Sequence, residues 1–118
     1  MTINWVTIKV ADFEASKAFY RDYLGLKPAN EMSAGPMNLA FFADDKGFQI
    51  ELIYNAAVSP SRVSDCISVG VAPDDYDALL NKARETGILA AEPAILGGHL
   101  ECFFVTDPNG LSVQIIKN

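Results

Sequence analysis

Glu51 is the side chain in this sequence best suited to acid–base chemistry. It lies in the segment Asp44–Ile53, which recurs 63 residues later as Asp107–Ile116 with the amide Gln114 in place of the acid. On a cavity floor, a carboxylate acts as a general base or accepts hydrogen bonds from a ligand. On an exposed strand it is only a solvated acid. We identify Glu51 as the candidate catalytic residue.

Few other reactive side chains are present. Cys66 and Cys102 lie in apolar, strand-like runs without a CxxC motif, which is typical of reduced core cysteines. The single histidine, His99, follows two glycines and has no acid–base companions nearby, so we interpret it as a hydrogen-bonding residue at a rim. Lys9 adds one positive charge to an alternating strand, where a lysine is usually solvated.

Composition limits the possible partners. The chain has 118 residues, half of them hydrophobic, and a net charge of −6, which fits one globular domain. Without a basic stripe, binding to nucleic acid or to an anionic membrane is not expected. The start of the chain lacks a signal peptide, and no apolar run reaches the roughly 20 residues that span a bilayer. We expect a cytoplasmic protein.

The first half of the chain has the order βαβββ. The alternation in Asn4–Val10 predicts a strand, and Asp12 and Gly25 are the expected ends of the helix that follows. Three more strands are predicted in this half: Lys27–Met32, Met37–Ala43 and Phe48–Tyr54.

The second half repeats this order. Alternation in Cys66–Val71 predicts the first strand, at an offset of 61 from Trp5, and the apolar spacing after Tyr76 predicts a helix that ends at Gly87. The remaining predicted strands are Ile88–Ala91, Leu100–Thr106 and Leu111–Ile116. The domain therefore comprises modules at about 3–54 and 65–118, joined by a linker at about 55–64.

Each helix must cover one face of its sheet, which leaves the other face available to a ligand. We expect an α+β fold in which a curved mixed sheet forms a concave cavity with the helices outside. The face opposite the helices is predicted from the alternation to carry Trp5, Thr7, Lys9, Gln49, Glu51, Ile53, Cys66, Ser68, Gly70, Ser112, Gln114 and Ile116. Its predicted ligand-binding residues are Trp5, Thr7, Lys9, Gln49, Glu51, Cys66, Ser68 and Gln114.

The whole chain resembles the vicinal oxygen chelate superfamily, which includes glyoxalase I, bleomycin resistance proteins and extradiol dioxygenases. The resemblance rests on Val10–Tyr20 with the following Leu24-Gly25-Leu26, on Asp107–Gly110, and on Ile50–Asn55. It implies a homodimer that binds a small molecule. Whether the modules pair within one chain or across the dimer stays open.

The resemblance also implies where a metal would bind. The His/Glu/His/Glu ligand positions of glyoxalase-type relatives fall on Trp5, Glu51, Cys66 and Gln114, of which only Glu51 matches. Since an indole has no lone pair to donate and an amide is a weak ligand, we expect no metal or other cofactor.

Three hypotheses follow. The leading one is a protein that binds a small molecule without a metal. The alternative is a lyase, isomerase or dioxygenase-type enzyme of the same superfamily, with Glu51 as general base or metal ligand. The third is a structural or regulatory protein without a ligand, whose concave face is covered by protein.

Overall fold

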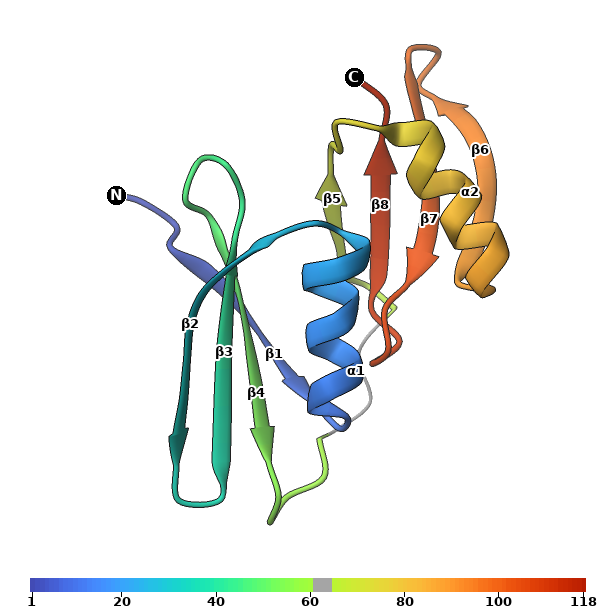
Figure 1. The fold of residues 1–118 in the computed structure, drawn as a ribbon. Coiled ribbons are helices and arrows are strands. Elements are labelled where there is room, and N and C mark those ends of the chain that lie inside the picture. Colours follow the sequence, from blue (N-terminus) through green and yellow to red (C-terminus); the bar gives the residue numbers. More distant parts are fainter. Residues whose placement is uncertain (61–64) are drawn as a thin grey trace. The chain divides into compact units, whose positions relative to one another are not determined.

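The structure, a computed structural model, describes residues 1–60 and 65–118. The chain divides into two compact units, Met1–Ser61 and Arg62–Asn118. Each contains a four-stranded mixed sheet with a helix in the order βαβββ (Figure 1). This confirms the predicted α+β fold with two tandem modules. Of the predicted linker at 55–64, residues 61–64 lie outside the described residues.

In the first unit the strand order is β1-β4-β3-β2, with β1 parallel to β4 and the other pairs antiparallel. The helical segment consists of α1 and the short π-helix η1. The elements are β1 (Trp5–Val10), α1 (Phe13–Ala18), η1 (Phe19–Tyr23), β2 (Lys27–Ala34), β3 (Met37–Ala43) and β4 (Gln49–Asn55).

The core of this unit lies between the sheet and α1–η1. Ile8, Ile50 and Leu52 are buried on the sheet face that α1 covers, and Phe19 and Tyr20 are buried on the helical side. Burying a large apolar side chain contributes about 1.5–3 kcal/mol. These contacts fix which side of β1 and β4 faces away from the helix.

The segment between Asp12 and Gly25 is helical as predicted, but only its first part is an α-helix. Asp12 caps α1 as expected, since its carboxylate accepts a hydrogen bond from the Ala15 amide at 3.0 Å. After Ala18 the backbone widens, and the Leu24 amide donates to the Phe19 carbonyl five residues back, at 3.0 Å. Phe19 and Tyr20, which begin this wider turn, are both buried.

In the second unit the strand order is β5-β8-β7-β6, again with the first strand parallel to the last. Asp75 caps the helix, and Gly87 ends it in the left-handed conformation (φ +74°). Tyr76 packs edge-on against Phe103, with ring centroids 5.1 Å apart. The elements are β5 (Ser68–Val71), α2 (Tyr76–Thr86), β6 (Leu89–Leu96), β7 (Leu100–Thr106) and β8 (Ser112–Ile116).

The predicted strand Cys66–Val71 begins two residues too early. The observed strand starts at Ser68, and Cys66 lies in a turn. The reason is its partner strand: Ser68 pairs with Ser112, the first residue of β8, so nothing on β8 remains to pair with Cys66.

The turns of the sequence repeat have the same construction. Asp44 accepts hydrogen bonds from the amides of Lys46 and Phe48, both at 2.9 Å. Asp107 accepts from the amides of Asn109 and Leu111, at 2.8 and 2.7 Å. Each aspartate therefore orients the strand that follows it, which in the first unit is the strand carrying Glu51.

Candidate functional site

The strand register of the first unit brings five predicted ligand residues onto one sheet face. Across β1 and β4, Trp5 pairs with Gln49 and Thr7 with Glu51, while Lys9 lies two residues beyond Thr7. Because side chains alternate along a strand, these five lie on the face opposite α1, here called the far face. They form the candidate site of this unit.

Glu51 is the centre of the far face. Its side chain accepts a hydrogen bond from the Thr7 hydroxyl at 2.5 Å, and the residue is only 7% exposed. A buried carboxylate is unfavourable unless it is hydrogen-bonded, so Thr7 stabilises it. The bond occupies Oε1 and leaves Oε2 available to a ligand.

An aromatic pair lies beside this carboxylate. Phe41 is the register partner of Glu51 on β3, and its ring meets the Trp5 indole edge-on, with centroids 5.5 Å apart. Trp5 remains 47% exposed. Its indole offers an apolar surface to a planar ligand next to a hydrogen-bond acceptor.

A pocket of about 300 Å³ lies at the carboxyl ends of β1 and β4. Lys9 and Ile53 border this pocket and are register partners across β1 and β4. This pair lies two residues beyond the pair Thr7–Glu51, which is a distance of about 6.6 Å along the strands. Among the described residues, Lys9 has no ion-pair partner. The pocket is mainly apolar and is lined by Lys9, Val10, Met37, Ile53, Asn55, Val58 and Pro60.

In the second unit the predicted residues are arranged differently. Gln114 lies on β8 opposite Gly70, and its amide nitrogen is 3.2 Å from the buried Cys102 sulfur. Ser68 is exposed at the start of β5. Cys66 is exposed in the preceding turn, with its sulfur 3.7 Å from a carboxylate oxygen of Asp65.

The register also corrects the offset between the first strands of the two modules. Trp5 pairs with Gln49 in the first unit, and Ser68 pairs with Ser112 in the second. The structural counterpart of Trp5 is thus Ser68, at the offset of 63 that holds for the closing strands, and not Cys66 at 61. A shift of two residues leaves each side chain on the same face of its strand, so alternation alone does not reveal it.

His99 has a local role. Its ring nitrogen Nδ1 is 2.8 Å from the Gly97 carbonyl oxygen in the turn between β6 and β7, and the residue is exposed.

The side chains at the four metal-ligand positions do not fit a metal ion. The Trp5 indole offers no lone pair, and one oxygen of Glu51 accepts from Thr7. Cys66 lies exposed in the turn before β5, and the Gln114 amide faces Cys102. Within residues 1–60 and 65–118, no cluster of three His, Cys, Asp or Glu side chains has a metal-binding arrangement.

Sequence reasoning missed part of the far face. Alternation along Met37–Ala43 would have placed Phe41 beside Glu51, because Phe41 and Glu51 occupy matching positions of a hairpin. Val58 and Pro60 carried no periodic signal and were assigned to the linker, although they line the pocket.

Residues 2–115 match the family model described as the Glyoxalase/Bleomycin resistance protein/Dioxygenase superfamily. A probable lactoylglutathione lyase of Vibrio cholerae is 31% identical, covering 94% of this chain and 86% of its own length. The lactoylglutathione lyase of Haemophilus influenzae is 30% identical, and the match covers 100% of this chain and 93% of that protein.

Solved structures share the fold. Glyoxalase I from Zea mays has a TM-score of 0.82 at 21% identity, covering 98% of this chain, which spans only 44% of that protein. A glyoxylase/bleomycin resistance protein/dioxygenase domain from Frankia has a TM-score of 0.81 at 15% identity, and the match covers 100% of this chain and 92% of that one.

No helix among the described residues is long and apolar enough to cross a membrane.

Proposed function

The chain belongs to the glyoxalase/bleomycin resistance protein/dioxygenase superfamily, and we propose that it binds a small molecule on the far face of its first sheet without a metal. The observation that carries the proposal is the position of the apolar pocket. It lies beside Lys9, a cation with no ion-pair partner among the described residues, and about 6.6 Å along the strands from the Thr7–Glu51 pair.

These groups define the chemistry of the ligand. An apolar part would fill the pocket, an anionic group such as a carboxylate would contact Lys9, and a hydrogen-bond donor would meet Oε2 of Glu51. Trp5 would cover a flat portion of the ligand. Gln49 borders this surface. For the second unit, Cys66, Ser68 and Gln114 are proposed as ligand-binding residues of that unit itself.

We propose further that the protein is a cytoplasmic homodimer. Cys66 is exposed and Cys102 is buried, and in a reducing compartment both side chains would remain thiols. The dimer is proposed from the family resemblance, and size-exclusion chromatography with light scattering would test it.

The name of the relatives suggests a concrete probe, S-lactoylglutathione, which is a thiol adduct with free carboxylates. We expect its addition, in the presence of EDTA, to shift the NMR amide signals of Thr7, Lys9 and Glu51. The substitution Glu51→Gln should weaken binding by about tenfold, the loss of one charge-assisted hydrogen bond. Shifts confined to residues outside the far face would refute the proposed site.

A second candidate function is catalysis by Glu51 as a general base. The buried carboxylate with one oxygen available and the naming of relatives as lactoylglutathione lyases favour it. The test is conversion of S-lactoylglutathione into methylglyoxal and glutathione, in which a thiol reagent traps the released thiol and draws the reaction forward. An enzyme should lose turnover with Glu51→Gln while its melting temperature stays near that of the wild type. Equal turnover in the two proteins would eliminate Glu51 as the base.

A further inference from the structure

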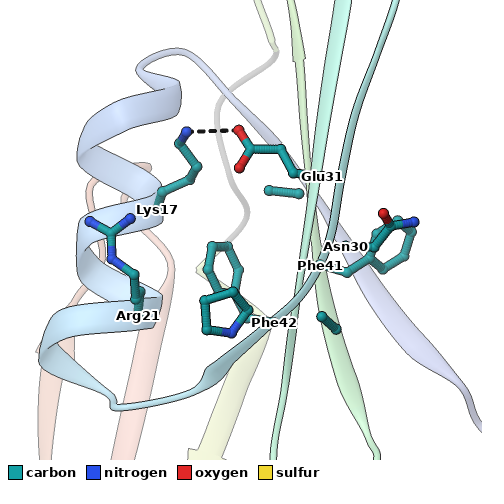
Figure 2. A pocket seen from close by; sticks show the side chains of 9 residues that line it. Lys17, Arg21, Asn30, Glu31, Phe41 and Phe42 are labelled. Atoms are coloured by element: carbon teal, nitrogen blue, oxygen red, sulfur yellow. Dashed lines mark hydrogen bonds and ion pairs between the residues drawn. The ribbon is translucent and has the colours of Figure 1, made fainter.

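A second pocket, of about 260 Å³, lies on the helical side of the first sheet, away from the far face. It is bordered by Lys17 of α1, Arg21 of η1 and Glu31 of β2, with Phe42 between the helix and the strands (Figure 2). The side chains of Asn30 and Phe41 point to the other side of the strands. The lining of this pocket therefore combines charged groups with apolar residues.

Two backbone irregularities shape this pocket. The π-helix η1 widens the helical turn that carries Arg21. On the opposite wall, the pairing of β2 with β3 shifts between Pro28 and Asn30, so that Ala29 has no register partner. Such irregularities are frequent beside functional sites because they redirect side chains and open space.

Lys17 is fully engaged within the protein. Its ammonium lies 2.9 Å from Glu31 and 3.0 Å from Glu14, and 4.5 Å from the Phe13 ring centroid. Although it lines the pocket, the residue is 8% exposed. It holds Glu31 in place through Oε1, which leaves Oε2 without a hydrogen-bond partner among the described residues.

Arg21 supplies the available positive charge. Its Nε and Nη2 bind the exposed Asp22 at 2.8 and 3.1 Å, while Nη1 has no partner among the described residues. The hydrogen bond and charge of Asp22, with smaller contributions from Glu14 and Glu31, raise the pKa of Arg21. Exposed pairs such as Arg21–Asp22 contribute little to stability, so the guanidinium is free to contact a ligand as well.

The combination of charges selects the ligand. A simple anion would be attracted to Arg21 but repelled by the nearby Glu31, and a simple cation would meet the opposite conflict. A molecule with both charges satisfies both groups. Pro28 and Ala29, which are exposed and line the pocket, provide apolar surface for the rest of the molecule. The volume restricts this molecule to a small one.

We propose that this pocket binds a small apolar α-amino acid as its zwitterion. The carboxylate contacts Nη1 of Arg21, the ammonium contacts Oε2 of Glu31, and the apolar side chain lies against Pro28 and Ala29. The site is independent of the far face and of the ligand proposed there.

The test is an NMR titration with L-leucine, compared with 4-methylpentanoate, which lacks the ammonium, and 3-methylbutylamine, which lacks the carboxylate. L-Leucine should shift the amide signals of Arg21, Glu31 and Phe42 and leave those of Thr7 and Lys9 unchanged. Each single-charge analogue should bind about tenfold more weakly or worse. Equal binding of all three compounds, no binding of L-leucine at millimolar concentration, or shifts centred on Thr7 would overturn the proposal.

Variants separate this site from general effects on the fold. Arg21→Gln and Glu31→Gln should each weaken L-leucine binding by about tenfold. Matched controls are Arg84→Gln and Glu92→Gln, which break an exposed 2.6 Å pair in the second unit and should leave binding unchanged. Arg21→Lys keeps the positive charge but lacks the planar guanidinium, so its loss of L-leucine affinity should be smaller than that of Arg21→Gln. Wild-type affinity in both Arg21→Gln and Glu31→Gln would contradict the assignment.

Discussion

Thr7 donates a hydrogen bond to the buried carboxylate of Glu51, whereas Gly70, at the matching position of the second unit, has no side chain to offer Gln114. The two modules share the same strand register but differ in the side chains at this pair of positions. Only the first unit has a carboxylate there together with a hydroxyl that donates a hydrogen bond to it. This difference is why we place the candidate site on the first sheet.

Removing the Thr7 hydroxyl should destabilise the protein. In Thr7→Val the shape is nearly kept, but Glu51 loses its donor in a buried position, which costs about 1–3 kcal/mol. Chemical denaturation monitored by circular dichroism would measure the loss. The control is Thr106→Val, an exposed strand threonine with no side-chain hydrogen bond among the described residues, which should change stability by less than about 0.5 kcal/mol. Equal losses in both variants would show that the Thr7 bond is energetically unimportant.

Neutralising Lys9 should weaken ligand binding without affecting the fold. Lys9 is exposed beside the apolar pocket and has no ion pair among the described residues, so Lys9→Met should leave the melting temperature near that of the wild type. Affinity for S-lactoylglutathione, measured by calorimetry, should fall about tenfold. Lys46→Met removes a turn lysine far along the strand from the pocket and serves as the control. If both variants bind alike, Lys9 does not contact the ligand.

The two turn aspartates should differ in their contribution to stability. Asp107 is 3% exposed, so Asp107→Ala leaves the Asn109 and Leu111 amides without their acceptor and should cost about 2–4 kcal/mol. Asp44 makes the same two amide bonds at an exposed position where water replaces it, so Asp44→Ala should cost about 1 kcal/mol. Urea midpoints of the two variants would give the comparison. The reverse order would show that burial does not decide the difference.

Stability should decline in alkali because of Tyr76. Burial, with a smaller effect of the Glu101 charge, raises the pKa of Tyr76 to about 12. An unfolded tyrosine has a pKa near 10. Because the buried phenolate is disfavoured, the folded state keeps its full stability below pH 10, and this stability declines as the pH rises toward 12.

Tyr76→Phe should remove much of this alkaline loss. It should also raise stability at neutral pH by about 1–3 kcal/mol, because the Tyr76 hydroxyl is buried without a hydrogen-bond partner in the described part of the chain. Thermal melts at pH 8 and pH 11 would test both effects. Tyr23, whose pKa burial also raises to about 12, titrates in the same range, so Tyr23→Phe is the parallel measurement. An unchanged pH dependence in Tyr76→Phe would contradict the first expectation.

The strand pattern and the repeat predicted most of the fold because alternation and turn residues are local signals. The Met37–Ala43 strand and the helix stop at Gly87 were predicted with the observed ends. The π-helix was not, because an apolar stripe indicates a helix but does not distinguish turns that close over four residues from turns that close over five. The start of β5 was also not predicted, because β5 begins only where β8 offers a pairing partner.

The candidate site was predictable to a similar degree. Glu51, Thr7 and Lys9 follow from alternation on two strands, once those strands are taken as neighbours. The pocket did not follow, since Val58 and Pro60 enter it through an irregular segment. The charged pocket beneath η1 depends on two backbone irregularities, for which the sequence carries no periodic signal.

The most direct test of the central proposal is calorimetric titration of S-lactoylglutathione into the protein, first after exhaustive dialysis against EDTA and then with added nickel or zinc. We predict the same affinity in all conditions, and a loss of about tenfold in Glu51→Gln. Binding that requires one equivalent of metal and disappears in EDTA would contradict the account.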